Sequence, residues 1–165
     1  NWMNQQYLLK LPEEEYFKMI DHVIQEGDYH NQDSGKIRQA AEILKTRLVT
    51  LSDLNQKLGL FFEENPEIKD LQAIEVLKED NSKTVLKEFL QQAENLDQLT
   101  SENLGQLVKS VQKTTGIKGR GLWMPLRCAI TREVSGPELP AMLDFFGGEK
   151  CLHLIRQTLE NPSLN

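Results

Sequence analysis

The chain has 165 residues, of which 39% are hydrophobic and 27% charged, and its formal net charge is −6. These proportions suffice for a buried core, and the length suits one domain or two small helical subdomains. Apolar runs are only a few residues long, which excludes a membrane span, and no basic and apolar leader opens the chain, so we expect no secretory signal. Because Asn1 is not an initiator Met, we expect a cut or an internal start there.

Helical spacing of apolar side chains begins where Pro12 opens a segment that ends at Gly27. Similar stripes predict further helices over residues 37–48, 50–62, 66–77, 81–93 and 100–116. The paired phenylalanines at 61–62 and 145–146 are expected in the core.

Polar residues mark the starts of several of these helices. Residues 50–53 form a variant of the capping box, residues 81–82 precede the fifth stripe, and Thr100 or Ser101 caps the sixth. Val, Ile, Thr and aromatic residues never alternate over the length of a strand, so no sheet is expected.

The predicted fold is therefore all-α, a helical cage or bundle of two small helical subdomains. We expect these subdomains to cover residues 1–95 and 96–165. The boundary would lie in the polar stretch 94–102, and the turn at 79–81 is the alternative.

One segment of this acidic chain is basic. Between Gly105 and Arg132 there are six Lys/Arg and no Asp/Glu, which leaves the rest of the chain with thirteen basic and twenty-five acidic side chains. The six are Lys109, Lys113, Lys118, Arg120, Arg127 and Arg132. A basic island on an acidic body is typical of a protein with one face that meets a polyanion. A cluster of this size can also be an ordinary solvated face, and charge alone leaves both interpretations open.

Glycine and proline shape the same region. Gly116, Gly119 and Gly121 predict a tight loop. Pro125 is then expected to open a helix, which would put Arg127 in its first or second turn, beside the positive end of the helix dipole.

The segment 135–138 repeats this pattern, because Pro137 is expected to open another helix and Glu138 to place a negative charge at its start. Two helix N-termini and Arg127 would then bracket a short loop that can hydrogen-bond phosphates or base edges. Trp123 could stack on a base, although its apolar neighbours favour a place in the core.

Patterns of catalytic or metal-binding residues are missing. His22, His30 and His153 have no Ser, Cys or carboxylate at the spacing of a triad. Cys128 and Cys151 have neither redox nor metal spacing and suit a reducing cytosol. No phosphate-binding fingerprint of a nucleotide site is present either. We therefore assign no catalytic residue and no metal.

The segment 122–152, LWMPLRCAITREVSGPELPAMLDFFGGEKCL, resembles the C-terminal signature of bacterial glutamyl-tRNA synthetases, MPLR-x-A-(L/V)-T-G followed by GPEL and LLxLLGxE. Residues 2–7 look like the Trp-x-Asn-x-x-Tyr segment just after the ATP-binding loop of those enzymes, and residues 47–54 with 61–62 resemble their middle helical portion. Arg132 departs from the pattern, because the family commonly has Gly there. The HIGH-type and KMSKS-type motifs are absent and belong to an N-terminal catalytic domain that this chain lacks.

The resemblance implies the anticodon-binding part of a glutamate–tRNA ligase of the cytoplasm. Its partner would be the tRNA for glutamate, with no DNA and no membrane, and it would be a monomer. ATP, with Mg, would serve the missing catalytic domain, so this segment alone would need no cofactor and would be inactive. The alternative is an all-α protein–protein interaction or scaffold module without RNA binding.

The resemblance also implies individual contacts with RNA. Arg127 would meet the first anticodon base, and Gly136, Pro137 and Leu139 would lie around the first and middle ones. Exposed cations would attract the tRNA backbone without sequence preference: Lys109, Lys113, Lys118 and Arg120. Alternatively, Arg127 simply pairs with a carboxylate such as Glu133 or Glu138.

Arg47 matches the family arginine that contacts the third anticodon base, which is C in tRNAs for glutamate and G in those for glutamine. Arg at this position goes with discrimination in the family, so we expect an enzyme of the glutamate-only type. The alternative is a helix-end arginine that favours the dipole or pairs with Glu42 or Asp53.

Overall fold

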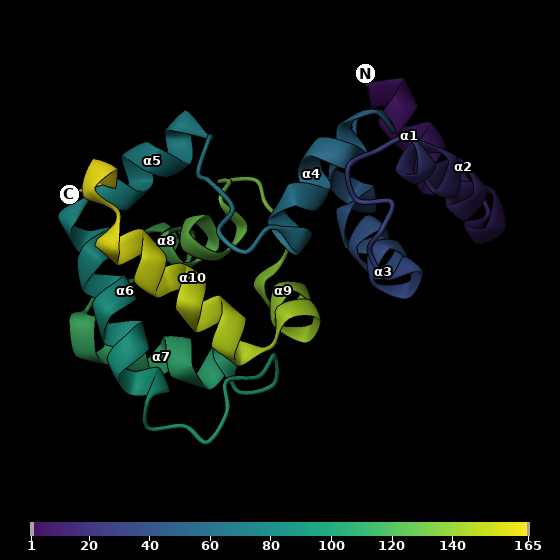
Figure 1. Cartoon of the computed structure of the whole chain (residues 1–165). Coiled ribbons are helices and arrows are strands. Elements are labelled where there is room, and N and C mark those ends of the chain that lie inside the picture. The colour runs from purple at the N-terminus through teal and green to yellow at the C-terminus, as the bar shows by residue number, and fades with distance from the viewer. Residues whose placement is uncertain (1, 165) are drawn as a thin grey trace. The chain divides into compact units, whose positions relative to one another are not determined.

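The computed structural model describes residues 2–164, which form helices joined by short loops (Figure 1). In chain order these are α1 (Trp2–Lys10), α2 (Glu13–Gln25), α3 (Ser34–Leu44), the 3-10 helix η1 (Lys45–Arg47), α4 (Asp53–Phe62), α5 (Leu71–Lys78), α6 (Asp80–Ala93), α7 (Leu104–Thr115), α8 (Arg120–Thr131), α9 (Leu139–Phe146), α10 (Gly148–Glu160) and the 3-10 helix η2 (Pro162–Leu164). No strand occurs within 2–164, which confirms the all-α prediction. Over the same residues, none of the helices has the length and apolar character that crossing a membrane requires.

The chain divides into two compact units, the first ending at Pro66 and the second beginning at Glu67. This division differs from the predicted boundary near residue 95. The physical reason is the packing of α5 and α6, since α6 lies against α7, α8 and α10, and α5 lies against α8 (Figure 1). Residues 67–95 therefore share a core with the C-terminal helices.

In the first unit, α3 packs against α2 and α4 around a fully buried Tyr16. The Tyr16 hydroxyl donates a hydrogen bond of 2.8 Å to the Ala41 carbonyl, and burial raises the pKa of this phenol well above its usual value. Gln5 Nε2 donates to the Thr46 carbonyl at 2.8 Å, which ties α1 to η1. The bond from Gln5 thus holds the turn that carries Arg47.

The predicted link between residues 50 and 53 is present, but the N-caps differ from those predicted: Ser52 precedes α4 and Asn103 precedes α7, and neither makes a side-chain cap bond. Before α4, Asp53 Oδ2 accepts a hydrogen bond from the Thr50 N–H at 2.9 Å. At α7, Asn103 Oδ1 accepts from the Thr100 N–H at 2.8 Å, and the Thr100 hydroxyl accepts from the Asn103 N–H at 3.3 Å. The predicted end of α7 is also confirmed, because Gly116 follows it in the left-handed conformation, with φ of 72°.

Other predictions about helix starts and the core are wrong. The helix expected over 66–77 begins only at Leu71, because Asp70 caps it through the Gln72 N–H. The next helix begins at Asp80, so Ser82 lies inside it, and the Ser82 hydroxyl bonds the Val76 carbonyl at 2.6 Å instead of capping. Among the paired phenylalanines only Phe61 is buried, and its three counterparts lie half-buried.

Candidate nucleic-acid interface

Helix α8 is the centre of the second unit, and it begins earlier than predicted. Gly119, with φ of 61°, is its N-cap, so Pro125 lies inside the helix and does not open it. The connection from α7 to α8 needs only four residues, 116–119, because Gly116 and Gly119 both take positive φ values that a side chain would strain. Arg127 is therefore the eighth residue of α8, away from the positive end of its dipole.

Arg127 connects α8 to the start of α9. Its Nη2 atom lies 2.9 Å from Glu138 Oε2, and its Nη1 donates to the Gly136 carbonyl at 3.3 Å. The Arg127 side chain is 23% exposed and that of Glu138 is 65% exposed. The alternative interpretation, in which Arg127 pairs with Glu138, thus describes a contact that is present in the structure without RNA.

The segment 132–138 joins these helices, and we call it the α8–α9 loop. It begins at Arg132, whose φ of 64° is the left-handed conformation that Gly favours after a helix. The Arg132 guanidinium is buried, and it donates to the Thr158 hydroxyl at 2.7 Å and to Gln157 Oε1 at 3.0 Å, both on α10. Burial lowers the pKa of Arg132 to about 10. Arg132 therefore anchors the loop and adds no charge to the surface.

Further contacts hold the middle of the α8–α9 loop. Asp70 Oδ2 accepts a hydrogen bond of 2.9 Å from the Val134 N–H. The Thr131 hydroxyl lies 2.9 Å from both the Arg127 and the Glu133 carbonyl oxygens. Gly136 packs so closely on Thr131 that an added Cβ would overlap its side chain. The loop therefore has little room to change shape.

The loop ends at Glu138, the N-cap of α9. The prediction that Pro137 opens this helix is wrong, because the first turn contains Pro140, and Pro137 precedes the cap. Gly136 and Pro137 are buried, and the Leu139 side chain is 3% exposed and belongs to the core. Of the GPEL residues, Glu138 alone is exposed.

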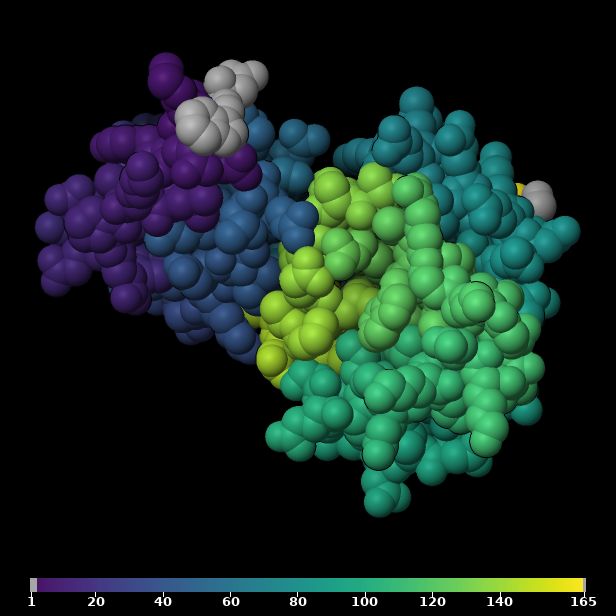
Figure 2. Space-filling model, turned by 180° about the vertical axis from the view of Figure 1, so that it is seen from behind, coloured from purple at the N-terminus to yellow at the C-terminus, as the bar shows by residue number. Residues whose placement is uncertain are grey.

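The four cations expected along the tRNA backbone are all exposed: Lys109, Lys113, Lys118 and Arg120. Lys109 and Lys113 are four residues apart on α7 and thus share one side of that helix. Helices α7 and α8 with the connection between them form a large part of the face that the second unit presents in Figure 2, in the green colours of the bar.

Sequence reasoning favoured a core position for Trp123, and the structure leaves 43% of this residue exposed. Arg120, Trp123 and Arg127 follow one another three and four residues apart, so they share one face of α8. An aromatic ring thus stands between two guanidinium groups on that face.

Arg47 is the last residue of η1, directly after α3, and is half-buried. Its charge therefore lies near the negative end of a helix dipole, as the helix-end alternative requires. Arg47 belongs to the first unit and Arg127 to the second.

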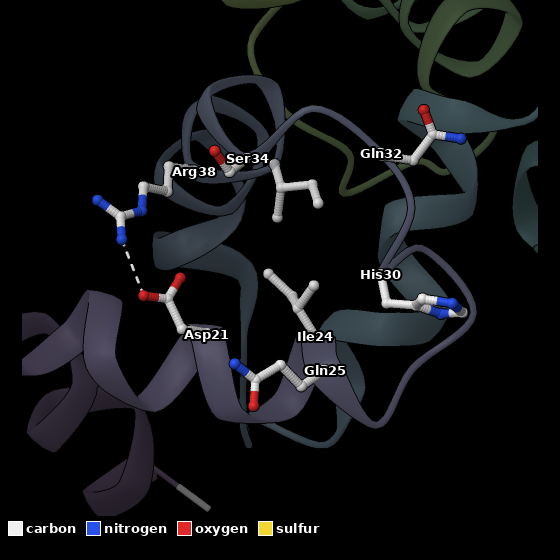
Figure 3. Close-up of a pocket in the computed structure, with 8 residues that line it drawn as sticks. Asp21, Ile24, Gln25, His30, Gln32, Ser34 and Arg38 are labelled. Atoms are coloured by element: carbon white, nitrogen blue, oxygen red, sulfur yellow. Dashed lines mark hydrogen bonds and ion pairs between the residues drawn. The ribbon is translucent and has the colours of Figure 1, made fainter.

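The first unit has a shallow pocket of about 280 Å³ between α2 and α3. Asp21 and Arg38 face each other at its rim, 2.8 Å apart, and both are about half exposed (Figure 3). None of the predicted RNA contacts lines this pocket.

Within residues 2–164 we find no cluster of His, Cys, Asp and Glu side chains able to hold a metal ion. Burial raises the pKa of the Cys128 and Cys151 thiols to about 12, so both stay protonated.

Comparison with known proteins gives concordant results. A family model described as an anticodon binding domain matches residues 7–159. The glutamate–tRNA ligases of Latilactobacillus sakei and Geobacillus stearothermophilus are each 33% identical to the chain over 96% of its length. The chain spans about a third of the length of these curated relatives. A crystal structure of a glutamate tRNA ligase from Elizabethkingia meningosepticum, 23% identical, shares the fold with a TM-score of 0.71 over 97% of this chain and 31% of that one.

Proposed function

The chain belongs to the family of anticodon-binding domains, and from this premise we propose that it reads the anticodon of the tRNA for glutamate as part of a glutamate–tRNA ligase. The observation that carries the proposal is the face of α8 with Arg120, Trp123 and Arg127, on a chain of net charge −6 whose segment 105–132 also has exposed lysines and no acidic residue. This face combines the cations that attract phosphates with an aromatic ring on which an unstacked base can lie.

Each group has a distinct part in this proposal. The Arg127 guanidinium offers donors to the O2 and N3 acceptors of an unstacked pyrimidine. The end of the α8–α9 loop, with Gly136 and Pro137, and the first residue of α9, Leu139, supply a rigid edge around it. Lys109, Lys113, Lys118 and Arg120 add attraction to the backbone that does not depend on sequence, and Arg47 reads the third anticodon base.

The chain would position tRNA and perform no chemistry itself. Binding energy at the anticodon would orient the distant acceptor end for glutamate attachment, with ATP and Mg bound in the rest of the ligase. We place the ligase in the cytoplasm and expect a monomer. Release of pyrophosphate by this chain alone, dependent on glutamate, ATP and tRNA, would contradict the assignment.

Binding of tRNA to the 165-residue chain is expected to depend steeply on salt. With about four phosphate contacts and a slope of roughly −0.7 per contact, doubling the salt concentration should weaken binding about sevenfold. Titrations with glutamate tRNA at 0.1 and 0.2 M salt, concentrations of about the physiological order, measure this directly. A flat response would favour the alternative of an interaction or scaffold module without RNA binding.

Replacing Trp123 with Ala should weaken tRNA binding about fivefold, because loss of one stacked base contact costs roughly 1 kcal/mol at a half-exposed site. Trp123→Phe keeps an aromatic ring and should lose less. Affinities measured for both variants at one salt concentration give the comparison. If Trp123→Ala binds as tightly as the unchanged chain, the ring does not contact RNA.

A further inference from the structure

The α8–α9 loop is held by the N-cap of α5, a helix that carries none of the predicted RNA contacts. Asp70 is the N-cap of α5, and its Oδ1 accepts from the Gln72 N–H at 2.9 Å, which is an ordinary cap bond. Its second oxygen, Oδ2, accepts from the Val134 N–H at 2.9 Å, although Val134 lies 64 residues further along the chain. One carboxylate thus caps α5 and ties down the middle of the loop.

This double role requires a carboxylate. Asp presents two acceptor oxygens, one for each N–H, whereas Asn has one oxygen and a donor group, and Ser has one oxygen in all. An Asn or Ser side chain whose single oxygen keeps the local cap bond to the Gln72 N–H therefore leaves the Val134 N–H without its acceptor. Hydrogen bonds to an ionised carboxylate are also stronger than those to a neutral oxygen.

A shift of Val134 would also shift the residues that bind the Arg127 side chain, because they follow Val134 closely in the chain. Gly136, two residues on, accepts the bond from Arg127 Nη1 at 3.3 Å, and Glu138 forms the ion pair with Nη2 at 2.9 Å. The position of the loop therefore sets the direction of the Arg127 guanidinium. Arg132 is a further anchor, because its side chain holds the first residue of the loop to α10.

We infer that Asp70 is a positioning residue of the nucleic-acid interface: its carboxylate fixes the α8–α9 loop and thereby orients Arg127 for reading a base. This inference rests on the proposed function. Asp70 itself touches no RNA in this arrangement and acts through Val134.

The test compares the unchanged chain with Asp70→Asn and Asp70→Ser in two measurements. Amide hydrogen exchange at Val134, recorded without RNA, should become about tenfold faster, since one hydrogen bond of the loop is lost. The preference for glutamate tRNA over a tRNA with a changed first anticodon base should fall about fivefold to tenfold. The salt slope should stay the same, because the phosphate contacts are untouched.

Asp33 provides a matched control, because it caps α3 by the same kind of bond, from the Lys36 N–H to Oδ1 at 2.9 Å. Asp33→Asn should leave Val134 exchange and anticodon preference as they are. The inference is overturned if Asp70→Asn changes Val134 exchange no more than Asp33→Asn does, or if exchange quickens while the preference stays intact. An unchanged chain without any preference between the two tRNAs would overturn the proposed function and the RNA role of Asp70, and the exchange rates would still report whether Asp70 holds the loop.

Discussion

Replacing Arg127 with Ala is expected to weaken binding of glutamate tRNA about ten- to a hundredfold, with the fold intact. The base loses its guanidinium donors, which is worth about 1–3 kcal/mol at a site shielded from water. The exposed Glu138 carboxylate also loses the cation 2.9 Å away and would then repel the RNA. Stability should change by less than about 1 kcal/mol, because the ion pair is partly exposed to solvent. Affinity and circular dichroism are measured on the same variant.

The Arg127–Glu138 pair makes a second variant informative. If Arg127 reads a base, Glu138→Gln removes the carboxylate that competes for the Arg127 guanidinium, so tRNA binding should be kept or strengthened. If Arg127 serves only as the partner of Glu138, both variants should leave tRNA affinity unchanged. That joint result, with unchanged circular dichroism, would contradict the proposed role of Arg127.

Replacing Arg47 with Gln in the full-length ligase is expected to erode discrimination between the tRNAs for glutamate and glutamine by about ten- to a hundredfold. Cytosine at the third anticodon position offers O2 and N3 acceptors to an arginine. Guanine presents N1–H and N2–H₂ donors there, which oppose the guanidinium at a cost of about 1–3 kcal/mol. Gln carries both a donor and an acceptor and can therefore serve either base. The ratio of charging rates for the two tRNAs is the measurement.

A helix-end role for Arg47 predicts a different outcome. The residue ends η1 directly after α3, so its removal would cost some stability through the dipole. In that case charging of both tRNAs would decline together, and their ratio would not move. Lys45→Gln removes the other cation of the same turn and serves as the control, since Lys45 lies over the Tyr16 ring, 4.5 Å from its centre.

Local patterns predicted the helices well, because the core follows helical periodicity. Tyr16, Ile20 and Ile24 recur at helical spacing in the sequence and are all buried on one side of α2. The contact of Thr50 with Asp53 was also predictable, since it joins residues three positions apart, whereas the N-caps themselves, Ser52 of α4 and Asn103 of α7, were missed. Errors at helix starts arose where a different residue begins the helix: Pro125 was expected to open α8, but the helix starts at Arg120, after the N-cap Gly119, and accommodates Pro125 in its interior.

The candidate site was less predictable, because its geometry depends on residues far apart in the sequence. The pairing of Asp70 with Val134 spans 64 positions and leaves no mark in the local pattern. The exposure of Trp123 depends on which face of α8 the other helices cover, and its buried neighbour Leu122 suggested the opposite. Arg132 was noticed as a departure from the resembled family, yet its bonds to α10 could not be inferred without the packing.

Arg132 has a consequence for engineering this protein. The residue stands where the resembled family commonly has Gly, and its side chain occupies space between α8 and α10 while bonding Thr158 and Gln157. A segment transplanted from a relative with Gly at that position would leave the Thr158 hydroxyl facing an unfilled gap. The α8–α9 loop of this chain is therefore not an interchangeable module, and exchanging it with a homologue requires moving its contact residues on α10 as well.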